Sequence, residues 1–99
     1  MKLEVIKVIN TQFPNRTENI YSSIFGRTSG YYADEPKVTF IEKNTIEHSD
    51  WIEENNITTF PTTLFYKDGE LIAEKKGIIA NQHIIAEIEP YIPKFAIKK

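Results

Sequence analysis

The 99-residue sequence contains no cysteine, and this absence excludes several classes of chemistry. Without a thiol, the chain can form no disulfide, offer no cysteine nucleophile and supply no thiolate to a zinc or iron–sulfur site. Its four glycines form no glycine-rich phosphate-binding loop. No uninterrupted apolar run approaches the roughly 20 residues of a membrane-spanning helix. We therefore expect no metal, no cofactor and no membrane association.

The sequence also lacks a cluster of basic residues, since acids and bases are spread along the chain and the net charge is −2. A nucleic-acid-binding face needs such a cluster. The small basic end formed by Lys94, Lys98 and Lys99 is typical of a solvated tail, so we expect no nucleic-acid partner. Met1–Lys7 has no long apolar segment of a signal peptide, which favours the cytoplasm. Frequent Ile, Lys and Asn are typical of an AT-rich bacterium, its phage or a plasmid.

The length fits one domain over residues 1–99, with residues 93–99 as a loosely held tail. Hydrophobic and turn patterns predict alternating strands and helices in the first half. Leu3–Ile9 is apolar on both faces, as in an interior strand. The predicted strands in this half cover residues 3–9 and 37–41, with a loop over 30–36 before the second strand. Between the strands, Pro14 opens a predicted helix that Gly26 ends, and its apolar residues are Ile20, Tyr21, Ile24 and Phe25. A short helix follows the second strand, with a capping pattern at 44–47 and with Trp51 and Ile52 on its buried side.

The second half predicts a β-hairpin and a closing helix. Thr62–Tyr66 and Glu70–Lys75 are strands on either side of the turn signal Lys67-Asp68-Gly69. Ile84, Ile85, Ile88 and Ile92 then form a helical stripe, which Pro90 should end near Glu89. The order is β-α-β-α-β-β-α. It predicts an α/β fold with a four-stranded mixed sheet and helices on both faces.

The residues from Ile57 to Ile92 resemble the corresponding part of thioredoxins. The family pattern places a proline and threonine before a strand, a Gly-Glu turn after it, and a second glycine before the last helix. The matching residues are Ile57, Pro61, Thr62, Phe65 or Tyr66, Gly69, Glu70 and Gly77. The earlier elements agree in order only, and the N-terminal strand and helix of typical thioredoxins are missing. The resemblance implies a minimal thioredoxin-like fold with a cis Phe60–Pro61 bond beside the family's active site.

The family's C-x-x-C motif has no counterpart here. The resemblance aligns its positions with Phe13, Pro14, Asn15 and Arg16, and the family's buried acidic residue with Lys7 or Ile6. Neither a phenyl ring nor a guanidinium can perform thiol–disulfide exchange. We therefore expect no dithiol oxidoreductase activity and no catalytic residues.

Other enzymatic sites have little support in the sequence. His48 and His83 are far apart and are interpreted as surface residues at the starts of two helices. The acidic residues lie on predicted solvated helix faces, so no paired carboxylates are indicated. The consecutive residues His48-Ser49-Asp50 cannot form a catalytic triad within one helical turn.

The first hypothesis is therefore a non-catalytic module that binds a protein or an extended peptide. Its groove would be lined by residues of three converging loops, with Arg16 as an anion contact at the helix start. These residues are Phe13, Pro14, Asn15, Arg16, Thr59, Phe60, Pro61, Gly77 and Ile78. In an alternative arrangement, Phe13 and Phe60 turn inward and plug the site. Two other functions remain open: an oxidoreductase-related protein that uses an external thiol, or a structural subunit with an apolar patch around Tyr31 and Tyr32.

Overall fold

The computed structural model describes residues 1–12 and 16–94, and it contains one four-stranded sheet in the order β2-β1-β3-β4. β1 pairs with β2 in parallel and with β3 in antiparallel orientation, and β3 and β4 form an antiparallel hairpin. The elements are β1 (Leu3–Ile9), α1 (Arg16–Tyr31), β2 (Val38–Asn44), α2 (Ser49–Glu54), β3 (Thr62–Lys67), β4 (Glu70–Lys76) and α3 (Asn81–Ile88). The predicted order and the mixed sheet are confirmed.

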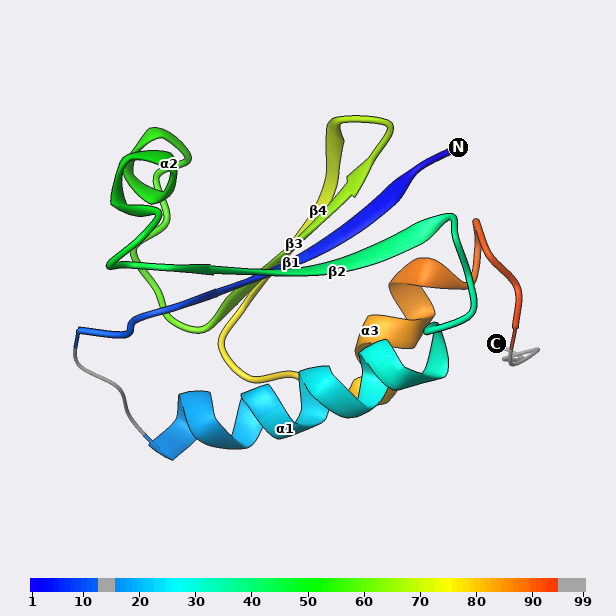
Figure 1. Cartoon of the computed structure of the whole chain (residues 1–99), viewed down its shortest axis with the longest axis horizontal. Coiled ribbons are helices and arrows are strands. Elements are labelled where there is room, and N and C mark those ends of the chain that lie inside the picture. The colour runs from blue at the N-terminus through cyan, green and yellow to red at the C-terminus, as the bar shows by residue number, and fades with distance from the viewer. Residues whose placement is uncertain (13–15, 95–99) are drawn as a thin grey trace.

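Helices cover both faces of this sheet, as predicted, with α1 and α3 on one face and α2 on the other (Figure 1). Alternation along β1 divides its side chains between two apolar clusters. Leu3 and Val5 pack with residues of α1 and α3, whereas Ile6 and Val8 pack with Ile52 of α2. The apolar residues on both faces of β1 are therefore explained by two separate cores.

α1 is longer than predicted, because Gly26 does not end it and Gly30 and Tyr31 belong to the helix rather than to a loop. Tyr21, Phe25 and Thr28 are buried along one side of α1, and Tyr32 continues this line just beyond its last residue. Glycine inside a helix costs about 1 kcal/mol. Burial of the turns beyond Gly26 outweighs that cost, and Gly26 itself lies on the exposed side.

The other predicted boundaries need smaller corrections. The capping pattern at 44–47 does not start a helix: the Asn44 side chain accepts the N–H groups of Ile46 and Glu47 in a turn, and α2 begins at Ser49. α3 ends at Ile88, close to the predicted end, and Ile92 is buried in the turn that follows. Within the predicted tail, the Lys94 Nζ lies 3.0 Å from Asp34 Oδ1. Residues 95–99 lie outside the described residues.

The patch predicted around Tyr31 and Tyr32 is not formed. Tyr31 is exposed, but Tyr32 is buried and stacks on the Phe40 ring with their centroids 5.9 Å apart. The sequence pattern placed both rings in a loop, whereas the extension of α1 directs the second ring into the core. An apolar patch of paired tyrosines is therefore excluded.

Candidate functional site

The end of the sheet where β1 and β2 finish carries a network of short polar side chains. Parallel strands end at the same edge of a sheet, so the loops after β1 and β2 lie side by side. The Thr11 N–H donates to Thr45 Oγ1 at 3.0 Å, and Thr45 Oγ1 donates to Asn10 Oδ1 at 3.1 Å. These bonds fix the β1–α1 and β2–α2 loops to each other.

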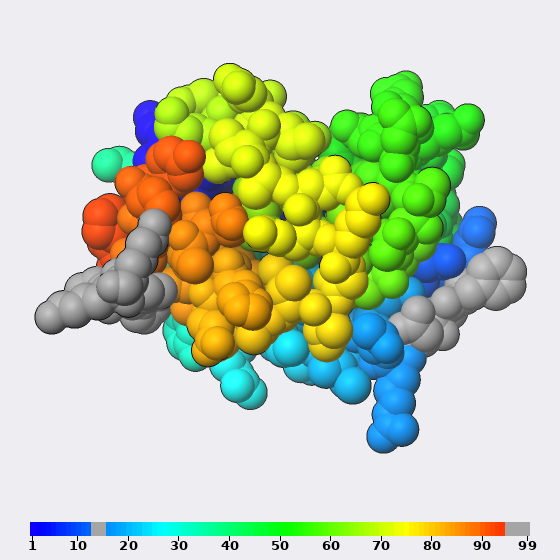
Figure 2. Space-filling model, turned by 180° about the vertical axis from the view of Figure 1, so that it is seen from behind, coloured from blue at the N-terminus to red at the C-terminus, as the bar shows by residue number. Residues whose placement is uncertain are grey.

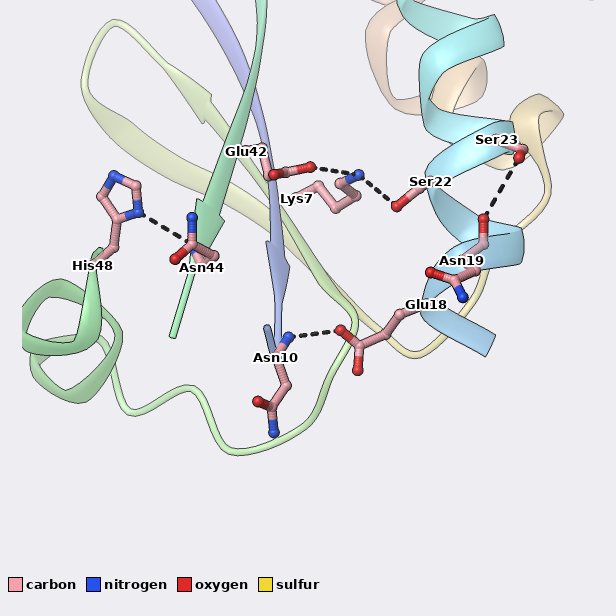
Figure 3. A network of polar contacts seen from close by, with 9 residues as sticks. All are labelled: Lys7, Asn10, Glu18, Asn19, Ser22, Ser23, Glu42, Asn44 and His48. Atoms are coloured by element: carbon pink, nitrogen blue, oxygen red, sulfur yellow. Dashed lines mark hydrogen bonds and ion pairs between the residues drawn. The ribbon is translucent and has the colours of Figure 1, made fainter. Parts of the chain in front are cut away.

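His48 belongs to this network through a backbone contact. Its Nδ1 accepts the N–H of Asn44 at 3.1 Å (Figure 3), and its own N–H donates to the Asn44 carbonyl at 2.9 Å. These bonds hold the turn that leads from β2 into α2. His48 directly precedes the first residue of α2 and His83 lies in the first turn of α3, as predicted. Among residues 1–12 and 16–94, no group of three His, Asp or Glu side chains is placed to hold a metal ion.

Glu18 is a buried carboxylate that sequence reasoning missed. It lies in the first turn of α1 and accepts the N–H of Asn10 at 2.6 Å (Figure 3). A negative charge is favourable beside the free N–H groups at a helix start. Glu18 therefore ties the end of β1 to the beginning of α1. The signal available in the sequence was an acidic residue shortly after a helix-opening proline.

Lys7 is a buried base in the middle of β1, with only 3% of its surface exposed. Its Nζ lies 2.9 Å from Ser22 Oγ and 2.9 Å from Glu42 Oε1 (Figure 3), and 5.1 Å from the centroid of the Phe25 ring. The resemblance assigned the family's buried acidic position to Lys7 or Ile6. The face of the sheet beneath α1 thus carries the Lys7 cation where the family has an acidic residue. Among the described residues, Glu42 of β2 supplies its counter-charge.

The segment around Pro61 lies beside the residues that follow β4. The Phe60–Pro61 peptide bond is cis, the geometry that the resemblance implies. The Gly77 N–H donates to the Pro61 carbonyl at 2.7 Å, and Gly77 has a φ of +82°. A positive φ of this size favours glycine because it has no Cβ. The structure thus brings Thr59–Pro61 and Gly77–Ile78 together, as two of the three predicted loops.

The predicted groove residues differ in how far they reach the surface. Thr59, Ile78 and Arg16, the first residue of α1, are exposed, whereas Pro61 is fully buried. Phe60 is half-buried and packs against the cluster that contains Ile52. The Phe60 side chain is therefore packed against the core on one side and accessible to solvent on the other. Phe13, Pro14 and Asn15, which complete the predicted groove, lie outside the described residues.

The segments that bear these residues share one surface. Figure 2 shows the yellow segment after β4 above the light-blue start of α1 and next to the green segment that leads into β3. A pocket of about 440 Å³ adjoins this surface, with the buried Ile52 and Ile57 in its lining. The other lining residues are Gln12, Thr45, Ser49, Glu53, Asn56 and Thr58. Sequence analysis missed this pocket, because its polar residues come from α2 and from three separate loops.

The sequence matches no protein-family model and no curated protein. Solved structures do match. Thioredoxin-2 of the malaria parasite, described as a component of that parasite's protein secretion machinery, has a TM-score of 0.80 at 13% identity over 91% of this chain and 84% of that one. The oxidised thioredoxin of Plasmodium falciparum has a TM-score of 0.73 at 23% identity, over 91% and 81%. The chain has a thioredoxin-like fold.

A third thioredoxin-like match is the thioredoxin of Malassezia sympodialis, with a TM-score of 0.71 at 26% identity over 91% of this chain and 75% of that one. The expected thioredoxin-like fold is therefore confirmed, in a chain without the C-x-x-C motif. Dithiol–disulfide exchange by residues of this chain is excluded by its composition. None of the helices within residues 1–12 and 16–94 is long and apolar enough to span a membrane.

Proposed function

We propose that this protein is a non-catalytic thioredoxin-fold module that binds an extended segment of another protein at the loops around Pro61. The observation that carries the proposal is a set of backbone groups left open beside apolar side chains. Within the described part of the chain, neither the N–H nor the C=O of Phe60 has a hydrogen-bond partner, and the same is true of Ile78. An extended peptide can pair with such groups as an added strand does.

Ile78 also exposes an apolar side chain, and two other isoleucines are exposed at the ends of elements near the β1–α1 and β2–α2 loops. Ile78 is 41% exposed, and Ile46, in the turn after β2, and Ile20, in the second turn of α1, are also exposed. Exposed apolar side chains on a surface are typical of interaction sites, and Ile78 supplies one directly beside the open backbone groups. Arg16, exposed at the start of α1, offers a positive charge to an acidic group of the bound segment.

Binding can be tested with a degenerate peptide array and a matched pair of variants. Ile78→Ser removes an apolar side chain from the proposed groove, whereas Leu71→Ser removes one that is 46% exposed on β4 near the hairpin turn. We expect Ile78→Ser and Phe60→Ala to weaken peptide binding at least tenfold, which corresponds to about 1.4 kcal/mol. Leu71→Ser should retain wild-type binding.

The outcome of this comparison decides the proposal. Equal losses in Ile78→Ser and Leu71→Ser, or no peptide bound by the wild-type protein, would remove it. Circular dichroism and urea unfolding establish that each variant is folded. An insulin-reduction assay with dithiothreitol tests the external-thiol alternative, since turnover above the buffer blank would show catalysis that the proposal excludes.

A further inference from the structure

β2 and β4 form the two edges of the sheet, and the two edges differ in how they are protected (Figure 1). β4 carries a register shift against β3 at Phe65 and Tyr66, and four of its seven residues are charged: Glu70, Glu74, Lys75 and Lys76. Irregular and charged edges resist pairing with another strand. β2 keeps one unbroken register with β1 over its seven residues. β2 is therefore the better edge for strand addition.

The two charged side chains of β2 are engaged by the protein's own residues. The Glu42 carboxylate lies 2.9 Å from the Lys7 Nζ and is directed under the sheet toward α1 (Figure 3). The Lys43 Nζ lies 5.3 Å from the centroid of the Trp51 ring on the opposite face. Charges on an edge strand normally discourage a second strand. Here both charges have partners on the two faces of the sheet, so this protection is weakened.

The backbone groups of β2 define which residues can pair outward. The Leu3 N–H donates to the Lys37 carbonyl at 2.8 Å, and a parallel ladder uses alternate residues of each strand. The even-numbered residues of β2 therefore direct their N–H and C=O groups away from β1. At the strand ends, Val38 N–H donates to Glu35 O and Asn44 N–H to His48 Nδ1. Phe40 and Glu42 lie between these capped ends and keep their outward N–H and C=O groups without a partner among the described residues.

We propose that β2 pairs with β2 of a second copy of this chain, in antiparallel register around a two-fold axis at Ile41. In this register, Phe40 of one copy faces Glu42 of the other, so the open N–H and C=O groups meet in hydrogen-bonded pairs. The axis passes between the two Ile41 residues, which form a non-hydrogen-bonded pair with closely spaced side chains. No like charges stand directly opposite each other, because Lys43 faces Thr39.

The side of α1 next to β2 leaves room for this pairing. Ser22 faces Lys7 and Glu42 (Figure 3), and Gly26 and Ser29 share its side of the helix at i+4 and i+7. The two-fold axis would bring α1 of each copy alongside the other, where small residues allow helix axes to approach to roughly 8–10 Å. A Cβ added at Gly26 would meet nothing within 4 Å, so this side of the helix is open.

The absence of native cysteine makes the register directly testable, since one substitution introduces one thiol. In Ile41→Cys, the two Cα atoms would lie about 4.5 Å apart on the axis, within the range that a disulfide can bridge. In Thr39→Cys, on the same strand and face, the two thiols would be separated by roughly 13 Å along the strands. We expect mild oxidation to produce a covalent dimer at least tenfold faster for Ile41→Cys than for Thr39→Cys.

Light scattering on the wild-type chain provides the second readout, and we expect a reversible dimer whose fraction rises with concentration. Gly26→Arg, on the exposed side of α1, should leave the fold intact and reduce dimer formation at least tenfold by blocking the helix approach. Either a monomer at millimolar concentration or equal cross-linking of the two cysteine variants would overturn the proposal. A dimer that Gly26→Arg does not weaken would also overturn it, because another surface would then be responsible.

Discussion

Lys7 shows how one buried charge is accommodated in the core of this fold. The Lys7 ammonium group donates to the Ser22 hydroxyl of α1, pairs with the Glu42 carboxylate of β2 and lies over the face of the Phe25 ring. A buried charge is costly unless such partners replace the water it has lost. The half-exposed Glu42 remains hydrated, so the pair lies at the boundary between the core and solvent. The Lys7–Glu42 pair should therefore contribute to stability mainly because Glu42 supplies a counter-ion to the buried Lys7 charge.

Removal of either partner distinguishes these contributions. Glu42→Gln keeps the shape but leaves the Lys7 charge without a counter-ion, and we expect a loss of roughly 1–2 kcal/mol in the free energy of unfolding. Lys7→Met removes the charge and keeps an apolar chain beneath α1, and should cost less than Glu42→Gln. Urea unfolding of both variants, of the double variant and of the exposed control Glu70→Gln provides the measurement. A stable Glu42→Gln beside a severely destabilised Lys7→Met would contradict this ranking and assign the effect to packing.

At the scale of single elements, the spacing of apolar residues predicts the bounds of an element where those bounds depend on nearby sequence alone. β1 was predicted with its observed bounds because apolar β-branched residues fill both of its faces. The length of α1 could not be predicted from Gly26, because the burial of Thr28 and Tyr32 depends on strands that come later in the chain. The pocket beside α2 was missed for a related reason, since its residues meet only when β1 and β2 end at one edge.

Two glycines provide opposite predictions for the same substitution. Gly26 lies in the interior of α1 with open space around it, so Gly26→Ala should stabilise the protein by about 0.5–1 kcal/mol. Gly69 closes the β3–β4 hairpin with a φ of +83°, so Gly69→Ala should destabilise it by roughly 1 kcal/mol. Thermal unfolding monitored by circular dichroism measures both. A stabilising Gly69→Ala would show that the turn adopts another conformation in solution.

At the scale of the whole molecule, the two proposed surfaces do not compete. The loops around Pro61 lie where β1 ends, whereas strand pairing would use the side of β2 (Figure 1). Antiparallel pairing of two copies would point their loop ends in opposite directions. A dimer of this kind would hold two extended segments at once, and tethered segments bind more tightly than single ones when both can engage.

The free energy of unfolding should fall at alkaline pH, because buried tyrosines lose protons less readily in the folded chain than in the unfolded one. Burial, with a smaller contribution from Glu89, raises the pKa of Tyr32 to about 12, and burial also raises the pKa of Tyr21 and Tyr66. Unfolded tyrosine titrates near pH ~10, so unfolding above that pH releases protons and is favoured as the pH rises. The stability that depends on neutral Tyr32 is complete below pH ~10 and is lost as the pH rises toward about 12.

Urea unfolding of the wild-type chain between about pH 8 and pH 11 should therefore show a falling free energy of unfolding at the alkaline end. Tyr32→Phe removes one titrating group and should make this fall shallower by roughly 1 kcal/mol over the same interval. Tyr31→Phe, which removes a hydroxyl from the neighbouring exposed ring, is the matched control and should keep the wild-type slope. A parallel loss of stability in Tyr32→Phe and in the wild-type protein would contradict the raised pKa of Tyr32. The Tyr32 hydroxyl would then lose its proton as readily in the folded chain as in the unfolded one, because water reaches it between α1 and β2.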